Sequence, residues 1–201
     1  TLFKGTRESC SHKVFGLSNC CSGKGVPLLT PWLCDAAEKL LDEKDDAGKY
    51  VPVVENYLSF IANPTASPAP QSWDDLLTDQ FKGKLQYSTP GQAGDGTAVL
   101  LLLQHLMGKE GALDYLGKLQ ANNVGPSSST GKLQPKVSNG ELLVANGDVQ
   151  MNLASIADDG SKFDIFFPAG ADGTRTTIAL PYVMGLAKSA PSSEQAKKLM
   201  E

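Results

Sequence analysis

The fold expected for this chain is decided by the stretch Lys84-Leu85-Gln86-Tyr87-Ser88-Thr89-Pro90-Gly91-Gln92-Ala93-Gly94-Asp95-Gly96-Thr97. Its first four residues are typical of a strand and run directly into a glycine-rich loop. The apolar residues at 97–107 then predict a helix. Because a strand, a loop and a helix in this order form one βα unit, we expect an α/β fold with a mixed sheet.

The chain on either side of this unit alternates strand-like and helix-like segments. Residues 51–61 are rich in Val, Tyr, Phe and Ile, which favour a strand. Ser72 and Asp75 form a capping pair that predicts a short helix at 72–77. Further helices are expected at 111–119, 131–139 and 192–200, and further strands at 122–124, 142–145, 150–154, 163–167 and 177–187.

Residues 1–48 differ in composition from the rest. All four cysteines, Cys10, Cys20, Cys21 and Cys34, lie there, and their even number allows three disulfide pairings in an oxidising compartment. A zinc site is the alternative, but no Cys-x-x-Cys spacing is present and the nearby histidine is isolated. The apolar spacing at 32–44 predicts one amphipathic helix. We therefore expect a cysteine-rich segment with one helix at 1–48 and an α/β lobe at 49–201.

The charge and hydropathy of the chain argue against two classes of partner. The 18 basic and 22 acidic residues give a net charge of −4 and form no basic block, so nucleic acid is not an expected partner. The longest apolar run, at 98–103, is far shorter than the ~20 residues that cross a bilayer. We therefore expect a protein that does not span the membrane.

The loop of the quoted stretch is the first candidate binding site. Its glycines, Gly96 among them, let backbone N–H groups approach a ligand, and the start of the following helix carries a partial positive charge. The hydroxyls of Ser88, Thr89 and Thr97 would add donors to an oxyanion, whereas Asp95 would repel it unless Asp95 faces an amino group or caps the helix. A tight turn that only connects two elements is the alternative.

The second candidate is the loop Val124-Gly125-Pro126-Ser127-Ser128-Ser129-Thr130-Gly131-Lys132, again between a predicted strand and a predicted helix. The hydroxyls of Ser128, Ser129 and Thr130 precede the helix, and Lys132 follows them. A solvated turn with ordinary N-capping is the alternative. Both loops lie at carboxyl ends of strands, where open α/β sheets bind their ligands.

Catalytic chemistry is not predicted. His12 and His105 are isolated in the sequence. Asp158, Asp159 and Asp164 lie around a glycine-containing turn, a pattern that is typical of a solvated loop. No nucleophile, base and orienting group come together in the sequence. We therefore expect a binding protein rather than an enzyme, with no metal and no cofactor.

Residues from about 50 to 201 resemble the 2-aminoethylphosphonate-binding periplasmic proteins of ABC transporters. The resemblance covers about three quarters of the chain. It is carried by Asn56-Tyr57-Leu58-Ser59-Phe60, by most of the quoted stretch, and by Tyr115-Leu116-Gly117-Lys118-Leu119-Gln120-Ala121-Asn122-Asn123-Val124-Gly125-Pro126. It continues in Ser129-Thr130-Gly131-Lys132-Leu133, Val144-Ala145-Asn146-Gly147-Asp148, Gln150-Met151-Asn152-Leu153-Ala154 and Pro181-Tyr182-Val183.

The resemblance implies a two-lobed, type II periplasmic solute-binding fold that closes on its ligand like a hinge without chemical turnover. The implied ligand is 2-aminoethylphosphonate or a related small phosphonate, and the implied partner is the permease of an ABC importer. The two candidate loops would face the cleft between the lobes, and Tyr182, beside a hinge strand, would contact the ligand.

Two features depart from that family. The chain is shorter than such proteins and shows no first-lobe strands before residue 49, so the first lobe is expected to be incomplete. Residues 1–48 instead resemble a cysteine-rich segment of TraN, the mating-pair stabilisation protein of conjugation, which implies a fusion near Gly48 and Lys49. An interaction module of the conjugation apparatus is therefore the alternative function.

Overall fold

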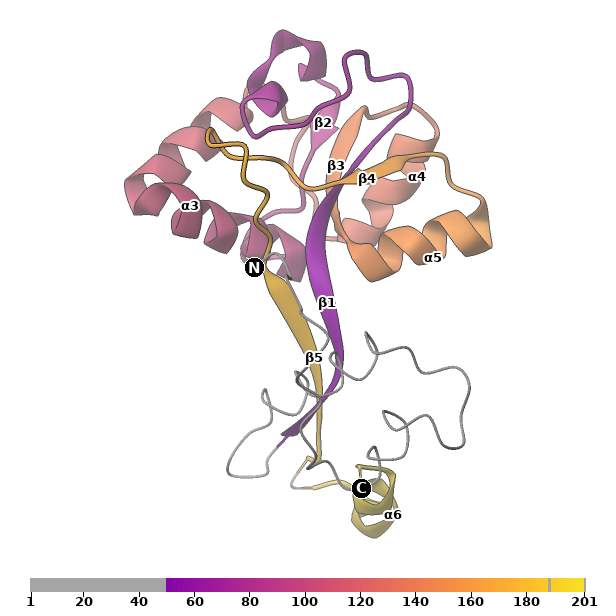
Figure 1. Cartoon of the computed structure of the whole chain (residues 1–201). Coiled ribbons are helices and arrows are strands. Elements are labelled where there is room, and N and C mark those ends of the chain that lie inside the picture. The colour runs from indigo at the N-terminus through magenta and orange to yellow at the C-terminus, as the bar shows by residue number, and fades with distance from the viewer. Residues whose placement is uncertain (1–49, 188, 201) are drawn as a thin grey trace, which may run out of the picture. The chain divides into compact units, whose positions relative to one another are not determined.

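The computed structural model describes residues 50–187 and 189–200 (Figure 1). Two compact units share these residues. Unit 1 spans Asn56–Leu180, and the described residues of unit 2 are 50–55, 181–187 and 189–200. The elements in chain order are β1 (Tyr50–Ala62), η1 (Asp75–Leu77), η2 (Asp79–Phe81), β2 (Leu85–Gln86), α3 (Gly94–Leu119), η3 (Thr130–Lys132), α4 (Leu133–Ser138), β3 (Val144–Asp148), α5 (Val149–Asp159), β4 (Asp164–Phe166), β5 (Ala179–Gly185) and α6 (Ser193–Met200).

The sheet contains both parallel and antiparallel neighbours. Its strand order is β2-β3-β1-β4, and β5 also pairs with β1. β2 runs parallel to β3, with Leu85 opposite Val144, whereas β1 is antiparallel to both β3 and β4. This arrangement confirms the predicted α/β fold with a mixed sheet.

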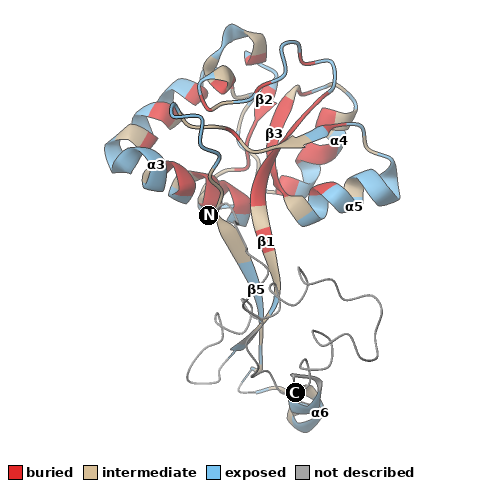
Figure 2. Ribbon diagram, viewed as in Figure 1, coloured by how far each residue is buried: buried red, intermediate tan, exposed pale blue. Residues whose placement is uncertain are grey.

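The core of unit 1 consists of two apolar clusters, each with residues from the sheet. Phe60 of β1 belongs to a cluster that includes Leu103 of α3 and Trp73, with the rings of Phe60 and Trp73 5.3 Å apart in an edge-to-face arrangement. The next residue of β1, Ile61, belongs to a second cluster with Leu133 and Val137 of α4. Successive strand residues point to opposite faces, so α3 and α4 pack against different faces of the sheet. Figure 2 shows buried residues along β2 and β3, along the part of β1 that pairs with β3, and on the neighbouring helices α3 and α4.

Helix α3 is interrupted at Gly108, whose φ of 73° and ψ of 171° are not helical. The two helices predicted at 97–107 and 111–119 are therefore confirmed as the two segments of α3. The first segment begins earlier than predicted, at Gly94.

Ser72 and Asp75 make the predicted reciprocal cap. The Asp75 N–H donates to Ser72 Oγ at 3.2 Å, and the Ser72 N–H donates to Asp75 Oδ2 at 2.9 Å. The backbone N–H of Gln71 is the largest cause that lowers the pKa of the Asp75 carboxyl. The helix that follows is one 3-10 turn, η1, and is shorter than predicted.

Two predicted strands are wrong. Residues 150–154 lie in helix α5, because the Asp148 carboxylate caps it by accepting from the Met151 N–H at 2.7 Å, and left-handed Gly160 (φ 65°) ends it. The strand predicted at 122–124 is reduced to a single bridge between Asn123 and Leu85. The helix predicted at 131–139 begins as the 3-10 turn η3 before α4.

The remaining predicted strands correspond to β1, β2, β3, β4 and β5, and the predicted terminal helix corresponds to α6. The amphipathic helix predicted at 32–44 and the four cysteines lie outside the described residues. Among the helices that the structure describes, none is both long and apolar enough to cross a membrane.

Candidate ligand-binding site

The two loops that the sequence singled out are in direct contact. The Thr89 N–H donates to the Ser127 carbonyl at 2.8 Å, and the Ser127 N–H donates to Thr89 Oγ1 at 3.0 Å. The Thr130 hydroxyl lies 3.2 Å from the Ser88 hydroxyl. The first loop follows β2 and the second follows the Asn123 bridge, and both of these backbone segments run parallel to their neighbours. Both loops therefore meet at the carboxyl edge of the sheet, as predicted.

The first turn of α3 is pressed against the end of β2. A Cβ atom added to Gly96 would stand 2.0 Å from the Ser88 carbonyl oxygen, so no other residue fits there without displacement. No side chain of the described residues caps this helix, and its first intrahelical bond is donated by the Thr97 N–H to the Ala93 carbonyl. The amides of Gly94, Asp95 and Gly96 precede that bond and are the donors that a helix start offers to an anion.

The two threonine hydroxyls of the first loop hold the loop in shape. Thr97 Oγ1 accepts from the Gly91 N–H at 2.9 Å and lies 3.1 Å from the Ala93 carbonyl, to which it donates. Thr89 Oγ1 accepts from the Ser127 N–H, and its own proton has no acceptor among the described residues. Thr89 is thus free to donate to a ligand, whereas such a role for Thr97 competes with its bond to Ala93. Ligand contact by either residue stays a prediction.

Ser88 is fully buried behind the loop and is joined to Asn146 of β3. The Ser88 N–H donates to Asn146 Oδ1 at 2.8 Å, and Asn146 Nδ2 donates to Ser88 Oγ at 2.9 Å. The position of Ser88 suits it to hold the end of β2 in place. Sequence reasoning missed Asn146, although a polar Asn-Gly-Asp run at the end of an apolar strand is a signal that was present.

Asp95 and Asp148 are buried carboxylates of the same region. Burial raises the pKa of the Asp95 carboxyl, a hydrogen bond with the Thr130 hydroxyl opposes this rise, and the charge of Asp148 adds to it. Asp148 is fully buried, and its Oδ2 atom has no hydrogen-bond partner in the described part of the chain. The Asn56 side chain accepts from the Gln150 N–H at 3.1 Å, and its Nδ2 is also buried without a partner among the residues that the structure describes. Sequence reasoning missed Asn56 and Asp148.

The serines of the second loop are the more accessible hydroxyls. Ser128 is exposed and Ser129 is half-buried, and neither side chain makes a hydrogen bond within the part of the chain that is described. Thr130 is buried. Tyr182 is 49% exposed and belongs to unit 2, so its predicted contact with a ligand held by these loops stays a prediction.

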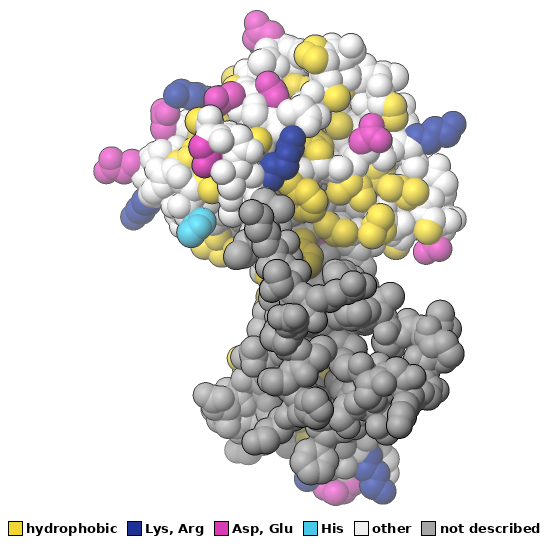
Figure 3. Space-filling model, in the orientation of Figure 1, with side chains coloured by type: hydrophobic (Ala, Val, Ile, Leu, Met, Phe, Trp, Pro, Cys, Tyr) yellow, Lys and Arg dark blue, Asp and Glu magenta, His cyan; other side chains and the backbone are white. Residues whose placement is uncertain are grey.

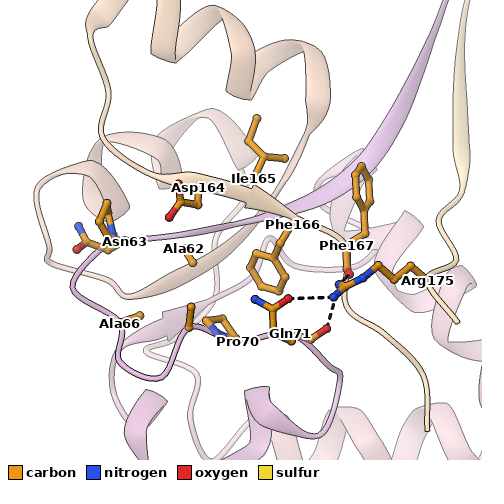
Figure 4. A pocket seen from close by; sticks show the side chains of 12 residues that line it. Ala62, Asn63, Ala66, Pro70, Gln71, Asp164, Ile165, Phe166, Phe167 and Arg175 are labelled. Atoms are coloured by element: carbon orange, nitrogen blue, oxygen red, sulfur yellow. Dashed lines mark hydrogen bonds between the residues drawn. The ribbon is translucent and has the colours of Figure 1, made fainter. Parts of the chain in front are cut away.

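A pocket of about 430 Å³ lies at the other end of β3 (Figure 4). It is lined by the end of β1, including Ala62, which pairs with Val144 at the start of β3. The Arg175 guanidinium on its rim donates to the Gln71 carbonyl at 3.1 Å and to Gln71 Oε1 at 2.9 Å. These hydrogen bonds connect the loop of Arg175 with the loop of Gln71. None of the predicted site residues lines this pocket.

Exposed apolar side chains also occur on α5. Figure 3 shows them gathered on the side of unit 1 where α5 lies. Leu153 of α5 is 54% exposed, and Met151 and Ile156 are also exposed. These side chains lack the polar groups that would recognise a small anion.

Comparison with known proteins gives consistent results. The chain is 54% identical over 175 residues to the "Putative 2-aminoethylphosphonate-binding periplasmic protein" of Salmonella typhi, which is 86% of this chain and 51% of the relative. The protein of the same name from Salmonella typhimurium (strain LT2) is 54% identical over 176 residues, and the match covers 82% of this chain and 52% of the relative. The chain therefore spans about half the length of the curated relatives it matches.

Solved structures show the same fold. The periplasmic binding protein P5PA has a TM-score of 0.66 and 27% identity, covering 86% of this chain and 52% of that one. AfuA from Actinobacillus pleuropneumoniae, solved with exogenous fructose-6-phosphate bound, has a TM-score of 0.64 and 23% identity, covering 77% of this chain and 49% of that one. The second likeness concerns the fold alone.

The family match fixes the class of protein. It covers residues 27–201 and therefore begins inside the segment 1–48, so a boundary at residue 48 and the likeness of 1–48 to TraN stay predictions. The matched family consists of solute-binding proteins, in agreement with the expectation of a binding protein. With most of its length matched, the chain belongs to the bacterial extracellular solute-binding protein family.

Proposed function

We propose that this chain forms part of a periplasmic solute-binding protein that captures 2-aminoethylphosphonate, or a related small phosphonate, for the permease of an ABC importer. The names of the relatives at 54% identity support the ligand class and the compartment. The observation that carries the proposal is the meeting of the uncapped start of α3 with the hydroxyl-rich second loop.

The chemistry of that meeting point suits a phosphonate. The amides of Gly94, Asp95 and Gly96 are oriented donors at the positive end of a helix dipole. The hydroxyls of Thr89, Ser128 and Ser129 add donors whose protons are not bound to other described residues. Hydrogen bonds to a charged oxygen contribute about 1.5–3 kcal/mol each, so a few such donors suffice for micromolar affinity.

The proposed organisation keeps residues 49–201 as the solute-binding lobe, with β1 and β5 as the hinge strands. Both strands have residues in unit 1 and unit 2. The alternative function, an interaction module of a conjugation apparatus, depends on residues 1–48, which lie outside the described residues. The described part of the chain offers no observation in its favour.

Calorimetric titration of the purified chain with 2-aminoethylphosphonate tests the proposal. We expect binding at micromolar concentration or tighter. Ser129→Ala should weaken that binding about tenfold or more, because it removes one donor to the charged phosphonate. Ser67→Ala, an exposed hydroxyl in the connection after β1, is the matched control and should leave affinity unchanged. Absence of heat at millimolar ligand would contradict the proposed function, and full affinity in Ser129→Ala would place the ligand elsewhere.

A further inference from the structure

The carboxylate of Asp148 uses only one of its oxygen atoms. Oδ1 accepts from the Met151 N–H at 2.7 Å and caps α5, whereas Oδ2 is buried and has no hydrogen-bond partner among residues 50–187 and 189–200. The side chain as a whole is fully buried. An ionised carboxylate only accepts hydrogen bonds, so the group missing at Oδ2 is a donor.

The starts of α3 and α5 differ in the ligand group that each could bind, an anionic group at α3 and a cationic group at α5. The N–H groups of Met151 and Gln150 at the start of α5 already donate to Asp148 and Asn56. The start of α3 has no side-chain cap from any residue that the structure describes. An anion therefore finds free donors at α3, and it finds a carboxylate oxygen at α5.

The carboxylates of Asp95 and Asp148 have no ion-pair partner among the described residues. Burial is the largest cause that raises the pKa of the Asp95 carboxyl, and the charge of nearby Asp148 adds to the rise. The ion pairs among the described residues involve Lys118, Lys136 and Lys197, and none of them includes Asp95 or Asp148. A buried carboxylate without a cation is costly, and a cationic ligand group would offset that cost.

We propose that Asp148, supported by Asp95, receives the ammonium group of the ligand while the start of α3 receives the phosphonate, so that the site selects aminoalkylphosphonates over phosphonates without an amine. The proposal rests on the proposed function, since it names the determinant of selectivity within the same site. Because Oδ2 is fully buried, the group that pairs with it is enclosed with it, and a primary ammonium is small enough and has three donors.

The test compares three probes on the purified full chain: 2-aminoethylphosphonate, ethylphosphonate and inorganic phosphate. We expect the unmodified chain to bind 2-aminoethylphosphonate at least tenfold more tightly than either of the others. Asp148→Asn should remove most of that preference. It should weaken the affinity for 2-aminoethylphosphonate at least tenfold, and it should leave the affinity for ethylphosphonate unchanged or higher. Asparagine keeps an oxygen that can cap α5, so the fold should persist, and a thermal melt checks this.

Asp164→Asn is the matched control, because Asp164 is an exposed carboxylate on β4 and pairs with Ala62 at the opposite end of the sheet. Asp164→Asn should keep the full preference for 2-aminoethylphosphonate over ethylphosphonate. If Asp148→Asn does not fold, equal binding of 2-aminoethylphosphonate and ethylphosphonate by the unmodified chain still overturns the proposal. A folded Asp148→Asn that keeps the preference overturns it as well and assigns Oδ2 to a bound water.

The outcomes separate this inference from the proposed function. Equal affinity for 2-aminoethylphosphonate and ethylphosphonate defeats the role of Asp148 and leaves a phosphonate receptor in place. Binding of none of the three probes defeats the proposed function itself, and the inference with it.

Discussion

The two ends of β3 are equally buried but chemically opposite. At its start, Val144 and Ala145 pair with Leu85 and with the apolar end of β1. At its end, Asn146 and Asp148 are just as buried and contact polar groups. Apolar burial stabilises a fold, whereas buried polar groups cost stability unless every atom is paired. The start of the strand therefore serves folding, while the Asp148 oxygen at its end, which has no partner among the described residues, points to binding.

The largest effect is expected at the apolar start of the strand. Leu85→Ala should lower the free energy of unfolding by about 2–5 kcal/mol, because it leaves a cavity beside Val144 in the main core cluster. Urea denaturation measures the loss. The preference for 2-aminoethylphosphonate over ethylphosphonate should survive in the folded fraction, and a changed preference would mean that the two ends are not separate in function.

A smaller effect is expected from Gly96→Ala at the polar end. The added methyl group would meet the Ser88 carbonyl, so the start of α3 must move, at a cost of about 1–3 kcal/mol in stability together with most of the ligand affinity. Gly94→Ala is the matched control, because a Cβ there meets nothing within 4 Å. Equal behaviour of the two variants in denaturation and calorimetry would show that the close approach of α3 to β2 does not shape the site.

The smallest effect, and one of opposite sign, is expected from Asp95→Asn. The folded protein raises the pKa of Asp95 above its ordinary value of 3.8, so it binds more protons than the unfolded chain in the window above that value. Stability therefore falls as pH rises through this window, and the ionised form destabilises the protein at neutral pH. Asp95→Asn should raise the melting temperature at pH 7 but not below pH 3.8. It should also weaken 2-aminoethylphosphonate binding.

Melting curves of the unmodified chain and of Asp95→Asn from pH 3 to pH 8 test this prediction. A lower melting temperature of the variant at pH 7 would show that ionised Asp95 has a stabilising partner, and it would weaken the view that the polar end lacks a positive charge.

Local sequence predicted most of the elements because the signals lie within a few residues of one another. Residues 51–61 and 84–87 became β1 and β2, and Gly108 separates the two helical segments expected on either side of it. The failure at 150–154 has a specific cause. Met151 and Leu153 alternate with polar residues as in a strand, but the cap by Asp148 makes the segment a helix whose apolar side chains are exposed.

The site was predicted in part. Both loops were identified from their glycines and hydroxyls, and the structure brings them into contact. Asn56, Asn146 and Asp148 were missed, since a single polar residue in or after a strand carries no local sign of what it will face. Asn146 reaches Ser88 across 58 positions of sequence, and Asn56 reaches Gln150 across 94.

The amino-acid sequence by itself determined the α/β class, the helix-starting loops and the solute-binding family, because periodicity, turn chemistry and long shared runs are properties of neighbouring residues. Only the tertiary structure decided which polar groups meet at the end of β3 and which of their atoms stay unpaired. The reason is that antiparallel pairing of β1 with β3, and parallel pairing of β2 with β3, juxtapose side chains that are far apart in the chain.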